Sequence, residues 1–361
     1  MSVENDLSET LKQYRDQIDA IDEQLLAFVN ERAALAREIG TLKNGGPIYR
    51  PEREAQVLRR LLDINQGPLS DVAVTAIFRS VVANCRALEK ELSVAFLGPL
   101  GTFSEEAAIK QFGLLSAPAQ CGSIDEVFRL VEAGKVDYGV VPVENSTEGA
   151  VPRTMDLLMT TSLHICGEIQ LPVHHNLLSK QTDKKYIRRL YSHAQSLAQC
   201  HEWINQNLPG IDRQAVASNA EAARLAANEG GAAAIAGLRA GELFGLNVLA
   251  ESIEDDPKNT TRFLVLATHD VAPSGHDKTS LVMATKNRPG AMAELLEPFA
   301  QHKVSMTKFE SRPSRTGMWE YVFFVDVEGH YQDEAVSAAL VELQQRASLL
   351  KVLGSYPVAV I

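Results

Sequence analysis

The stretch Val140-Val-Pro-Val-Glu-Asn-Ser-Thr-Glu-Gly-Ala-Val151, near the middle of the 361-residue chain, decides how the central part folds. Residues 135–143 are rich in valine and bounded by turn formers, which predicts a short buried strand. Residues 144–149 follow at once, and all but Gly149 carry hydrogen-bonding side chains. Ligands of open α/β sheets bind just beyond the carboxyl ends of the strands. A polar site is therefore expected here, although the stretch alone fits an ordinary surface loop equally well.

The composition limits the class of protein. The length predicts two or three domains, each large enough for its own core. A net charge of −11 argues against nucleic acid or an anionic membrane as the partner. An anionic substrate would then need its own local cluster of arginine and lysine. We find no apolar run of signal-peptide kind and none long enough to span a bilayer, and we expect a cytoplasmic protein.

The cysteines and histidines predict neither a disulfide framework nor a metal site. Cys85, Cys121, Cys166 and Cys200 are far apart in the sequence and form no C-x-x-C pair, which indicates reduced, buried thiols. The pair His174-His175 has no third ligand at a supporting spacing, so we expect no metal. No stretch demands a cofactor either.

The first ninety residues predict an all-helical domain. Glycine and proline divide them into helices at about 8–43, 51–65 and 69–91. In the first helix, apolar residues recur every seven positions, and Arg32 occupies one of these positions on the seam. Charged residues on the inner faces of all three helices predict a polar pocket inside the bundle; they are Arg32, Lys43, Glu54 and Glu89, with Arg15 and Arg53 close enough to contribute. So thin a unit of long helices is expected to dimerise.

This segment resembles the all-helical chorismate mutase domain. The positions that match the active site of that family are Arg15, Arg32, Lys43, Arg53, Glu54, Cys85 and Glu89. A Claisen rearrangement needs no nucleophile and no cofactor, only a site that holds a dianion compactly and stabilises charge on the breaking ether oxygen. The resemblance implies that Arg32, Arg53 and Arg15 of a partner chain hold the carboxylates. It also implies that Lys43 and Glu89 flank the ether oxygen and that Glu54 binds the substrate hydroxyl.

A change of pattern at residues 92–98, from helix period to a buried strand, begins a second domain. Thr102 and Glu105 form a capping box for the helix that follows a glycine loop, which is weak evidence for a nucleotide site. Two capped helices, opening at Ser123 and Ser218, each lead through glycine into a small-residue strand. This echo predicts two similar α/β lobes, roughly 93–168 and 172–250, with a cleft between them, as in periplasmic binding proteins. A pure binding function therefore has to be considered as well.

The central domain resembles prephenate dehydratase. The matching stretches are Phe96-Leu-Gly-Pro-Leu-Gly-Thr-Phe-Ser104, Val141-Pro-Val-Glu-Asn-Ser146, Tyr191-Ser-His193, Gly237 and Thr260-Thr-Arg-Phe263. The resemblance implies that Thr261 is the residue tied most closely to catalysis, and a neutral hydroxyl in a dry pocket can donate a proton to the departing ring hydroxyl. Residues expected to order Thr261 and the substrate are Glu144, Asn145, Ser192 and Gln199. Glu144 as the proton donor is the rival assignment. A Ser192–His193 catalytic pair is not expected, because adjacent side chains of a strand point to opposite faces.

The last part of the chain predicts the order βαββαβ, which is ferredoxin-like. It resembles the ACT domain, an amino-acid-sensing module. Glu310-Ser-Arg-Pro313 matches the phenylalanine-site motif of that family, and Gly290-Ala-Met-Ala293 stands where the other half usually has Gly-Ala-Leu-Val. The resemblance implies a phenylalanine site at Gly290, Ala291, Met292, Glu310, Ser311, Arg312 and Pro313. The alternative is a dimerisation module with a vestigial site.

Taken together, the chain resembles the bifunctional chorismate mutase–prephenate dehydratase family. The domains are expected at 1–92 (helical), 93–271 (two α/β lobes) and 278–361 (α+β, ferredoxin-like). The implied partners are chorismate, prephenate, the effector L-phenylalanine and a second copy of the chain, with no nucleic acid and no membrane. Two alternatives stay open: a dehydratase that prefers arogenate, the amino analogue of prephenate, and a non-catalytic amino-acid-binding regulator.

Glu89 leads to a first prediction, because many members of the mutase family have glutamine at the matching position. A glutamate can donate a hydrogen bond to the ether oxygen only when it is protonated. Mutase activity should therefore rise as pH falls, and the Glu89→Gln variant should show a flatter pH profile. Initial rates of chorismate consumption at a series of pH values would check this. A wild-type profile that stays flat across the series would contradict it.

Overall fold

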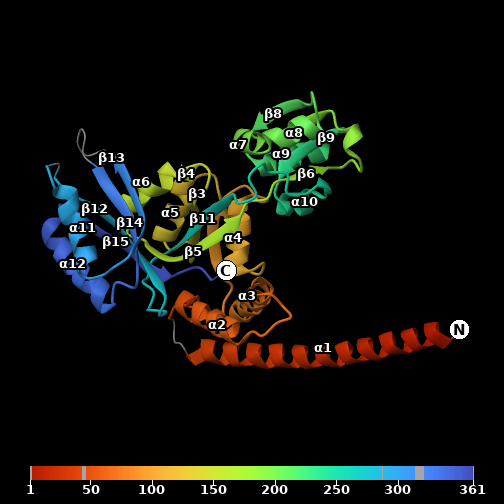
Figure 1. Ribbon diagram of the computed structural model, residues 1–361, viewed down its shortest axis with the longest axis horizontal. Helices are drawn as coiled ribbons and strands as arrows, with labels where there is room; N and C mark the ends of the chain where they lie inside the picture. The colour runs from red at the N-terminus through yellow and green to blue at the C-terminus, as the bar shows by residue number, and fades with distance from the viewer. Residues whose placement is uncertain (1, 43–45, 287, 314–320, 361) are drawn as a thin grey trace.

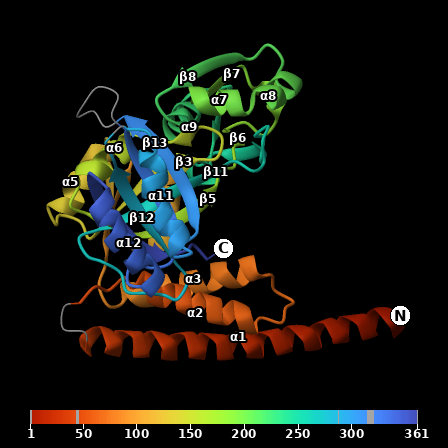
Figure 2. The same ribbon diagram turned by 60° about the vertical axis from the view of Figure 1, so that its left-hand side comes forward.

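The computed structural model describes residues 2–42, 46–286, 288–313 and 321–360. Its N-terminal part is helical, with α1 (Ser2–Leu42), α2 (Pro51–Ile64) and α3 (Asp71–Ala87). In both views α2 and α3 lie between α1 and the rest of the molecule (Figure 1 and Figure 2). Within the described residues, no helix is both long and apolar enough to cross a membrane.

The apolar stripe of α1 is largely uncovered in the single chain. Leu11, Ile18 and Leu25, which occupy the seven-residue repeat, are 48%, 55% and 55% exposed. Figure 1 shows the N-terminal half of α1 extending beyond the other helices. A contiguous apolar surface of this kind indicates an interaction site. It fits the expected dimer, in which a second copy would cover the stripe.

The central part consists of two lobes, each built on one sheet, as predicted. The first sheet has the order β2-β1-β3-β11-β5, with β4 paired to β3; its strands are β1 (Ser93–Leu97), β2 (Ala117–Cys121), β3 (Tyr138–Asn145), β4 (Gly149–Ala150), β5 (His164–Pro172) and β11 (Thr260–Ala267). The second has the order β10-β6-β9-β7-β8, from β6 (Asn176–Ser179), β7 (Arg189–His193), β8 (Asp212–Val216), β9 (Ala232–Ala236) and β10 (Asn247–Ala250). One expectation was incomplete: β11 follows the second lobe in sequence but lies in the first sheet, between β3 and β5.

Helices cover both sheets and begin where the sequence provides caps. The first lobe has α4 (Phe103–Phe112), α5 (Ile124–Glu132) and α6 (Pro152–Thr160); the second has α7 (Ala194–Gln199), α8 (His201–Asn207), α9 (Asn219–Asn228), α10 (Leu238–Phe244) and the 3₁₀ turn Lys184–Tyr186. The side chains of Thr102, Ser123 and Ser218 each accept a hydrogen bond from the backbone N–H three residues on. These N-caps confirm the predicted starts of α4, α5 and α9.

The C-terminal part has the predicted βαββαβ order. Its elements are β12 (Asp277–Ala284), α11 (Ala291–Gln301), β13 (Met306–Pro313), β14 (Tyr321–Glu328), α12 (Glu334–Arg346) and β15 (Leu349–Pro357), with the sheet order β13-β14-β12-β15. Helices α11 and α12 pack on one face of this sheet, where Leu295, Phe299 and Leu343 are buried. The other face turns toward the first lobe.

The first lobe and the C-terminal sheet share one hydrophobic core. Ile165 and Leu264 of the lobe belong to the same buried cluster as Val282, Phe324 and Leu353 of the C-terminal sheet. The backbones come so close that a Cβ on Gly354 would lie 2.2 Å from the Ile165 carbonyl oxygen. Only glycine permits this approach. The C-terminal domain is therefore fixed against the lobe.

The end of the chain also joins the helical domain to the other two. The Arg59 guanidinium of α2 donates to the carbonyl oxygens of His276 (2.8 Å) and Val358 (3.2 Å). Arg79 of α3 donates to the Val360 carbonyl oxygen, and the Ala359 N–H donates to Glu168 Oε1 at 3.2 Å. Residues 358–360 thus contact all three parts of the molecule.

Candidate functional sites

The first candidate site is a cavity of about 530 Å³ in the helical domain, here called the helical pocket. Five residues expected there from the sequence line it: Arg32, Arg53, Glu54, Cys85 and Glu89. Arg15 does not line it but lies on the exposed part of α1, and Lys43 lies outside the described residues. Ala272 and Pro273, from the connection between the other two domains, complete the wall.

Arg86 is the partner of Glu54, and the sequence analysis missed it. Its guanidinium pairs with the Glu54 carboxylate, donates to the Gln111 carbonyl oxygen at 2.9 Å and lies over the Tyr49 ring, 5.0 Å from its centroid. Burial raises the pKa of Glu54, and Arg86 partly opposes that shift. Arg86 is four residues after Val82, which also lines the pocket, so helix periodicity was a usable signal.

Glu89 lies just beyond the helix that was expected to carry it. The predicted helix to residue 91 was too long: α3 ends at Ala87, and the Glu89 N–H bonds the Arg86 carbonyl oxygen at 2.9 Å in a closing turn. Glu89 nevertheless lines the pocket, because α1 passes close to it at Gly40. A Cβ on Gly40 would lie 2.8 Å from Glu89 Cγ. The missing side chain at Gly40 therefore makes room for Glu89.

The second candidate site is a cavity of about 210 Å³ between the two lobes, here called the interlobe pocket. Asn145, Gln199 and Thr261 line it, as the sequence predicted. Ser192 is fully buried behind the wall, where its hydroxyl bonds Asn219 Oδ1 at 3.0 Å, and Asn219 lines the pocket. Glu144 is not among the lining residues.

The pairing of β3 with β11 explains this difference between Asn145 and Glu144. Thr261 is opposite Asn145, and Arg262 is opposite Glu144. Because side chains alternate along a strand, Thr261 and Asn145 face the pocket while Arg262 and Glu144 face away from it. The Glu144 carboxylate instead contacts Lys308 of the C-terminal domain at 2.7 Å. This geometry favours Thr261 over Glu144 as the proton donor.

The hydrogen bonds around Asn145 leave the hydroxyl proton of Thr261 available. The backbone N–H groups of Thr147 (3.1 Å) and Glu148 (3.2 Å) donate to Asn145 Oδ1, which fixes the orientation of the amide. Asn145 Nδ2 then donates to Thr261 Oγ1 at 2.8 Å and to Asn259 Oδ1 at 2.8 Å. Since Thr261 Oγ1 accepts from Asn145, its own O–H is free to donate toward the pocket.

Two further pocket residues, His175 and Asn259, were not predicted. Both are buried, and His175 Nε2 lies 2.9 Å from Gln199 Oε1. Burial lowers the pKa of His175, against the opposing effect of the Gln199 bond, so the ring is neutral at neutral pH. Within the described structure, His175 Nδ1 and Asn259 Nδ2 have no hydrogen-bond partner. Buried polar atoms without a partner are rare and call for an explanation.

The expectation that an anionic substrate would need arginine and lysine is not met in the interlobe pocket. The described residues that line it include neither. Instead, the N-terminal turns of two ten-residue helices meet there: Thr102 and Phe103 begin α4, and Ser218 and Asn219 begin α9. The first N–H groups of a helix lack intrahelical partners, and the helix dipole is positive at this end. Such ends bind carboxylates without a formal positive charge.

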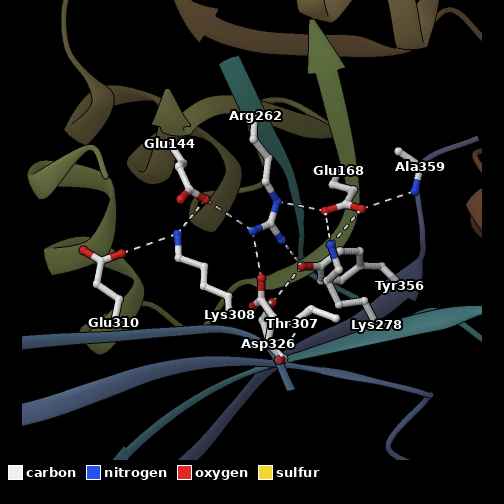
Figure 3. Close-up of polar contacts among 11 residues, drawn as sticks. Glu144, Glu168, Arg262, Lys278, Thr307, Lys308, Glu310, Asp326, Tyr356 and Ala359 are labelled. Atoms are coloured by element: carbon white, nitrogen blue, oxygen red, sulfur yellow. Dashed lines mark hydrogen bonds and ion pairs between the residues drawn. The ribbon is translucent and has the colours of Figure 1, made fainter. Parts of the chain in front are cut away.

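The outer face of the β3–β11 pair joins a set of charged residues, here called the interdomain ion network: Glu144, Glu168, Arg262, Lys278, Lys308, Glu310 and Asp326 (Figure 3). Arg262 donates to Glu168 at 2.8 Å and to Asp326 at 2.7 Å, and it bonds the Tyr356 hydroxyl at 2.9 Å. Burial works to lower the pKa of Arg262, but these partners together raise it above its usual value. The guanidinium is thus a fixed charge that ties β11 to the C-terminal sheet.

The two halves of the expected effector site lie on different elements of the C-terminal domain. Gly290, Ala291 and Met292 form the beginning of α11, where Gly290 is the N-cap with φ +82°. Glu310, Ser311, Arg312 and Pro313 are on the edge strand β13. The Arg312 side chain turns toward the central domain and contacts Asp156 at 3.1 Å, whereas Glu310 contacts Lys308 of the same strand at 3.4 Å.

Comparison with known families gives three matches along the chain. Residues 14–90 match the family described as chorismate mutase type II, residues 94–271 match prephenate dehydratase, and residues 279–344 match the ACT domain. The bifunctional chorismate mutase/prephenate dehydratase of Neisseria gonorrhoeae is 52% identical over 358 residues, which cover 98% of this chain and 99% of that protein. The protein of the same name from Stutzerimonas stutzeri is 48% identical over 362 residues. That match covers 98% of this chain and 99% of the Stutzerimonas protein.

A solved structure supports the same assignment for the last two domains. The prephenate dehydratase of Arthrobacter aurescens, in complex with L-Phe, superposes with a TM-score of 0.69 at 32% identity. The match covers 75% of this chain and 93% of that one. At this identity and coverage, the two proteins share the same fold in the two lobes and the C-terminal sheet.

The Glu54–Arg86 pair generates a stability prediction. Replacing Arg86 by Met removes the ion-pair partner of the Glu54 carboxylate, whose side chain is 18% exposed, and this should cost up to about 3 kcal/mol at neutral pH, the low end for a broken buried pair. Without Arg86 the pKa of Glu54 rises further, so the folded state binds more protons than the unfolded state above the ordinary value of 4.5. The deficit should therefore grow as pH rises and shrink toward pH 4.5. Urea unfolding at both ends of this range checks it.

The matched control for this experiment is Arg60→Met, at an exposed position of the same helix that carries Glu54. It should change the free energy of unfolding by less than about 0.5 kcal/mol at every pH. An Arg86→Met deficit that does not depend on pH would contradict the role given to Glu54.

Proposed function

The chain belongs to the family of bifunctional chorismate mutase/prephenate dehydratases, and we propose that it runs both reactions under feedback by L-phenylalanine. Chorismate would rearrange to prephenate in the helical pocket, and prephenate would become phenylpyruvate in the interlobe pocket. One observation carries this proposal: each pocket gathers most of the polar residues expected for its reaction, in domains that match both families in order. Prephenate is the expected dehydratase substrate, and arogenate is the alternative.

In the helical pocket, the residues would hold a dianion in its reactive conformation. Arg32 and Arg53 would bind carboxylates, Glu54 the substrate hydroxyl, and Glu89 the ether oxygen. Lys43 would join Glu89 at this oxygen. Because the rearrangement involves no nucleophile, compact binding and charge stabilisation are what the protein has to supply.

The helical pocket would be completed by a second copy of the chain. Arg15 lies outside the pocket of its own chain, on the half of α1 whose apolar stripe is exposed. A partner that packs on this stripe would bury it and bring its own Arg15 to the neighbouring pocket. The active form would therefore be a homodimer or a higher oligomer.

The four cysteines are buried and free, which fits a protein that works in a reducing cytoplasm.

In the interlobe pocket, the reaction would need one proton and two carboxylate-binding positions. Loss of CO₂ leaves the electrons of the broken C–C bond in the ring, and the ring C–O bond breaks as the hydroxyl takes up a proton and departs as water. Thr261 would supply that proton, since Asn145 donates to its Oγ1 and this contact leaves its O–H to donate. The N-terminal turns of α4 and α9, one from each lobe, would bind the carboxylates, with Asn259 Nδ2 as an additional donor.

A time course with chorismate as the sole substrate tests the proposed function. Chorismate should disappear and phenylpyruvate should accumulate, and L-phenylalanine should suppress the second product. Accumulation of prephenate would mean that the interlobe pocket takes another substrate, and arogenate would be added next. The absence of any saturable turnover at pH 5 and at pH 8 would leave the amino-acid-binding regulator as the correct description.

Thr261 gives a prediction about the proton donor. A Thr261→Ser enzyme keeps the hydroxyl and should retain substantial dehydratase activity. A Thr261→Val enzyme has nearly the same shape without the hydroxyl and should lose about 10²–10⁴-fold in kcat, the usual range for a general acid. Steady-state kinetics with prephenate checks this, with mutase activity as the control for folding. Equal dehydratase rates in the two variants would refute the assignment.

Asn259 gives a prediction about substrate binding. Its Nδ2 lacks a partner in the described structure, so a substrate carboxylate would satisfy it. A hydrogen bond to a charged group contributes about 1.5–3 kcal/mol, so Asn259→Ala should lower dehydratase kcat/KM about 10- to 100-fold. Asn228→Ala, on an exposed amide of α9, is the control and should change it less than about twofold. An unchanged kcat/KM in Asn259→Ala would show that this donor does not bind substrate.

A further inference from the structure

We propose that Lys308 couples the effector site at Glu310 to the catalytic strand pair β3–β11, because its ammonium is shared between Glu310 and Glu144. The inference rests on the proposed function, since it requires both the prephenate reaction and its inhibition by phenylalanine. It goes beyond that function by naming the side chains through which the effector would act. Its basis is the interdomain ion network on the outer face of β3 and β11 (Figure 3).

Lys308 lies between the expected effector motif and the central domain. Lys308 and Glu310 are two residues apart on β13, so their side chains share the face that turns toward the central domain. Lys308 Nζ lies 2.7 Å from Glu144 Oε2 and 3.4 Å from Glu310 Oε2. Its side chain is only 15% exposed, so water screens these contacts less than at an open surface. One cation thus holds a carboxylate from each domain.

Glu144 directly precedes Asn145, one of the residues expected to take part in the dehydratase reaction. Its neighbour Asn145 donates the hydrogen bond that orients Thr261 Oγ1. Its opposite residue in the sheet is Arg262, which directly follows Thr261. Glu144 Oε2 also lies 3.9 Å from the Arg262 guanidinium. A displacement of the Glu144 side chain would therefore act on β3 and β11 at the two residues next to the reacting ones.

Arg262 fixes β11 to the C-terminal sheet. A movement of Glu144 would therefore shift β3 relative to β11. The contacts of Arg262 with Glu168, Asp326 and Tyr356 occupy the guanidinium on several sides. Glu168 is held in turn by Lys278 at 2.9 Å and by the N–H of Ala359. We therefore place Arg262 as a positioning residue for Thr261, with Lys308 as the movable member of the network.

The charges of the interdomain ion network allow an amino acid to compete with Lys308. Among its described members, four carboxylates (Glu144, Glu168, Glu310 and Asp326) face three cations (Arg262, Lys278 and Lys308). Of the two carboxylates that Lys308 contacts, Glu310 is the more distant, at 3.4 Å against 2.7 Å for Glu144. The Glu310 side chain is also about a quarter exposed. The ammonium group of an amino acid would supply the missing positive charge at Glu310. Repulsion between the two ammonium groups would then shift Lys308 toward Glu144.

The test compares Lys308→Met with Lys308→Arg in the full-length protein. The measured quantities are kcat and KM for prephenate with and without saturating L-phenylalanine, and L-phenylalanine binding by calorimetry. Allosteric coupling typically changes an affinity about 5- to 150-fold. In Lys308→Met the phenylalanine-dependent change should fall below about twofold while phenylalanine still binds, and Lys308→Arg should restore at least half of it on a logarithmic scale.

Two further variants exclude a general effect of weakening the interface. Lys351 reaches across the same interface but donates to backbone carbonyl oxygens, those of Leu158 (2.9 Å) and Met159 (3.3 Å) among them, so Lys351→Met should remain inhibited. Glu144→Gln weakens the same contact from the other side. It should reduce the coupling as Lys308→Met does, and the double variant should be no worse than either single one.

The outcomes separate the inference from the function on which it rests. Full inhibition of Lys308→Met would overturn the inference while leaving the proposed function intact. Loss of phenylalanine binding in Lys308→Met would also overturn it, since Lys308 would then be part of the effector site. A wild-type enzyme that dehydrates prephenate but ignores phenylalanine would overturn the proposed regulation and this inference together.

Discussion

The pairing of β3 with β11 is the constraint on which the rest of the structure depends. It places Thr261 opposite Asn145 and Arg262 opposite Glu144. Because the side-chain period of a strand is two, one pair must face the interlobe pocket and the other must face the C-terminal sheet. A shift of register by one residue would bring charged side chains into the pocket and remove the hydroxyl from it. The proposed chemistry and the proposed control thus lie on opposite faces of one sheet.

The three domains form one connected body rather than separate modules on linkers. The first lobe and the C-terminal sheet share a core, and the close backbone approach at Gly354 allows no layer between them. The helical domain is tied to the others through Arg86, which bonds the Gln111 carbonyl oxygen at the end of α4. The opposite end of α4 lines the interlobe pocket. One helix therefore extends from one candidate active site to the other.

Much of the fold was predictable because it follows from local sequence patterns. Caps, glycines and periodicity predicted the helices, the two lobes and the βαββαβ order. The return of β11 into the first sheet was not predictable in this way, since strand pairing over more than a hundred residues leaves no local pattern. The orientation of Glu144 could have been inferred, because the alternation rule that excluded a Ser192–His193 pair applies equally to Glu144 and Asn145.

The composition of the sites was harder to predict than their location. Asn145, Gln199 and Thr261 were expected in the interlobe pocket and line it, whereas His175 and Asn259 become visible only as buried polar atoms without partners. The pocket also shows why counting charged residues is a poor guide to anion binding. Helix ends carry partial positive charge that belongs to the backbone and has no counterpart in the amino-acid composition.

The central claim is that the two faces of the β3–β11 pair act together, one in chemistry and the other in control. Amide hydrogen exchange of the full-length protein, with and without L-phenylalanine, tests it most directly. The account predicts a change in exchange at residues 140–146 and 260–264 in addition to any change in the C-terminal domain. A phenylalanine-dependent change confined to the C-terminal domain, in an enzyme that phenylalanine inhibits, would contradict it.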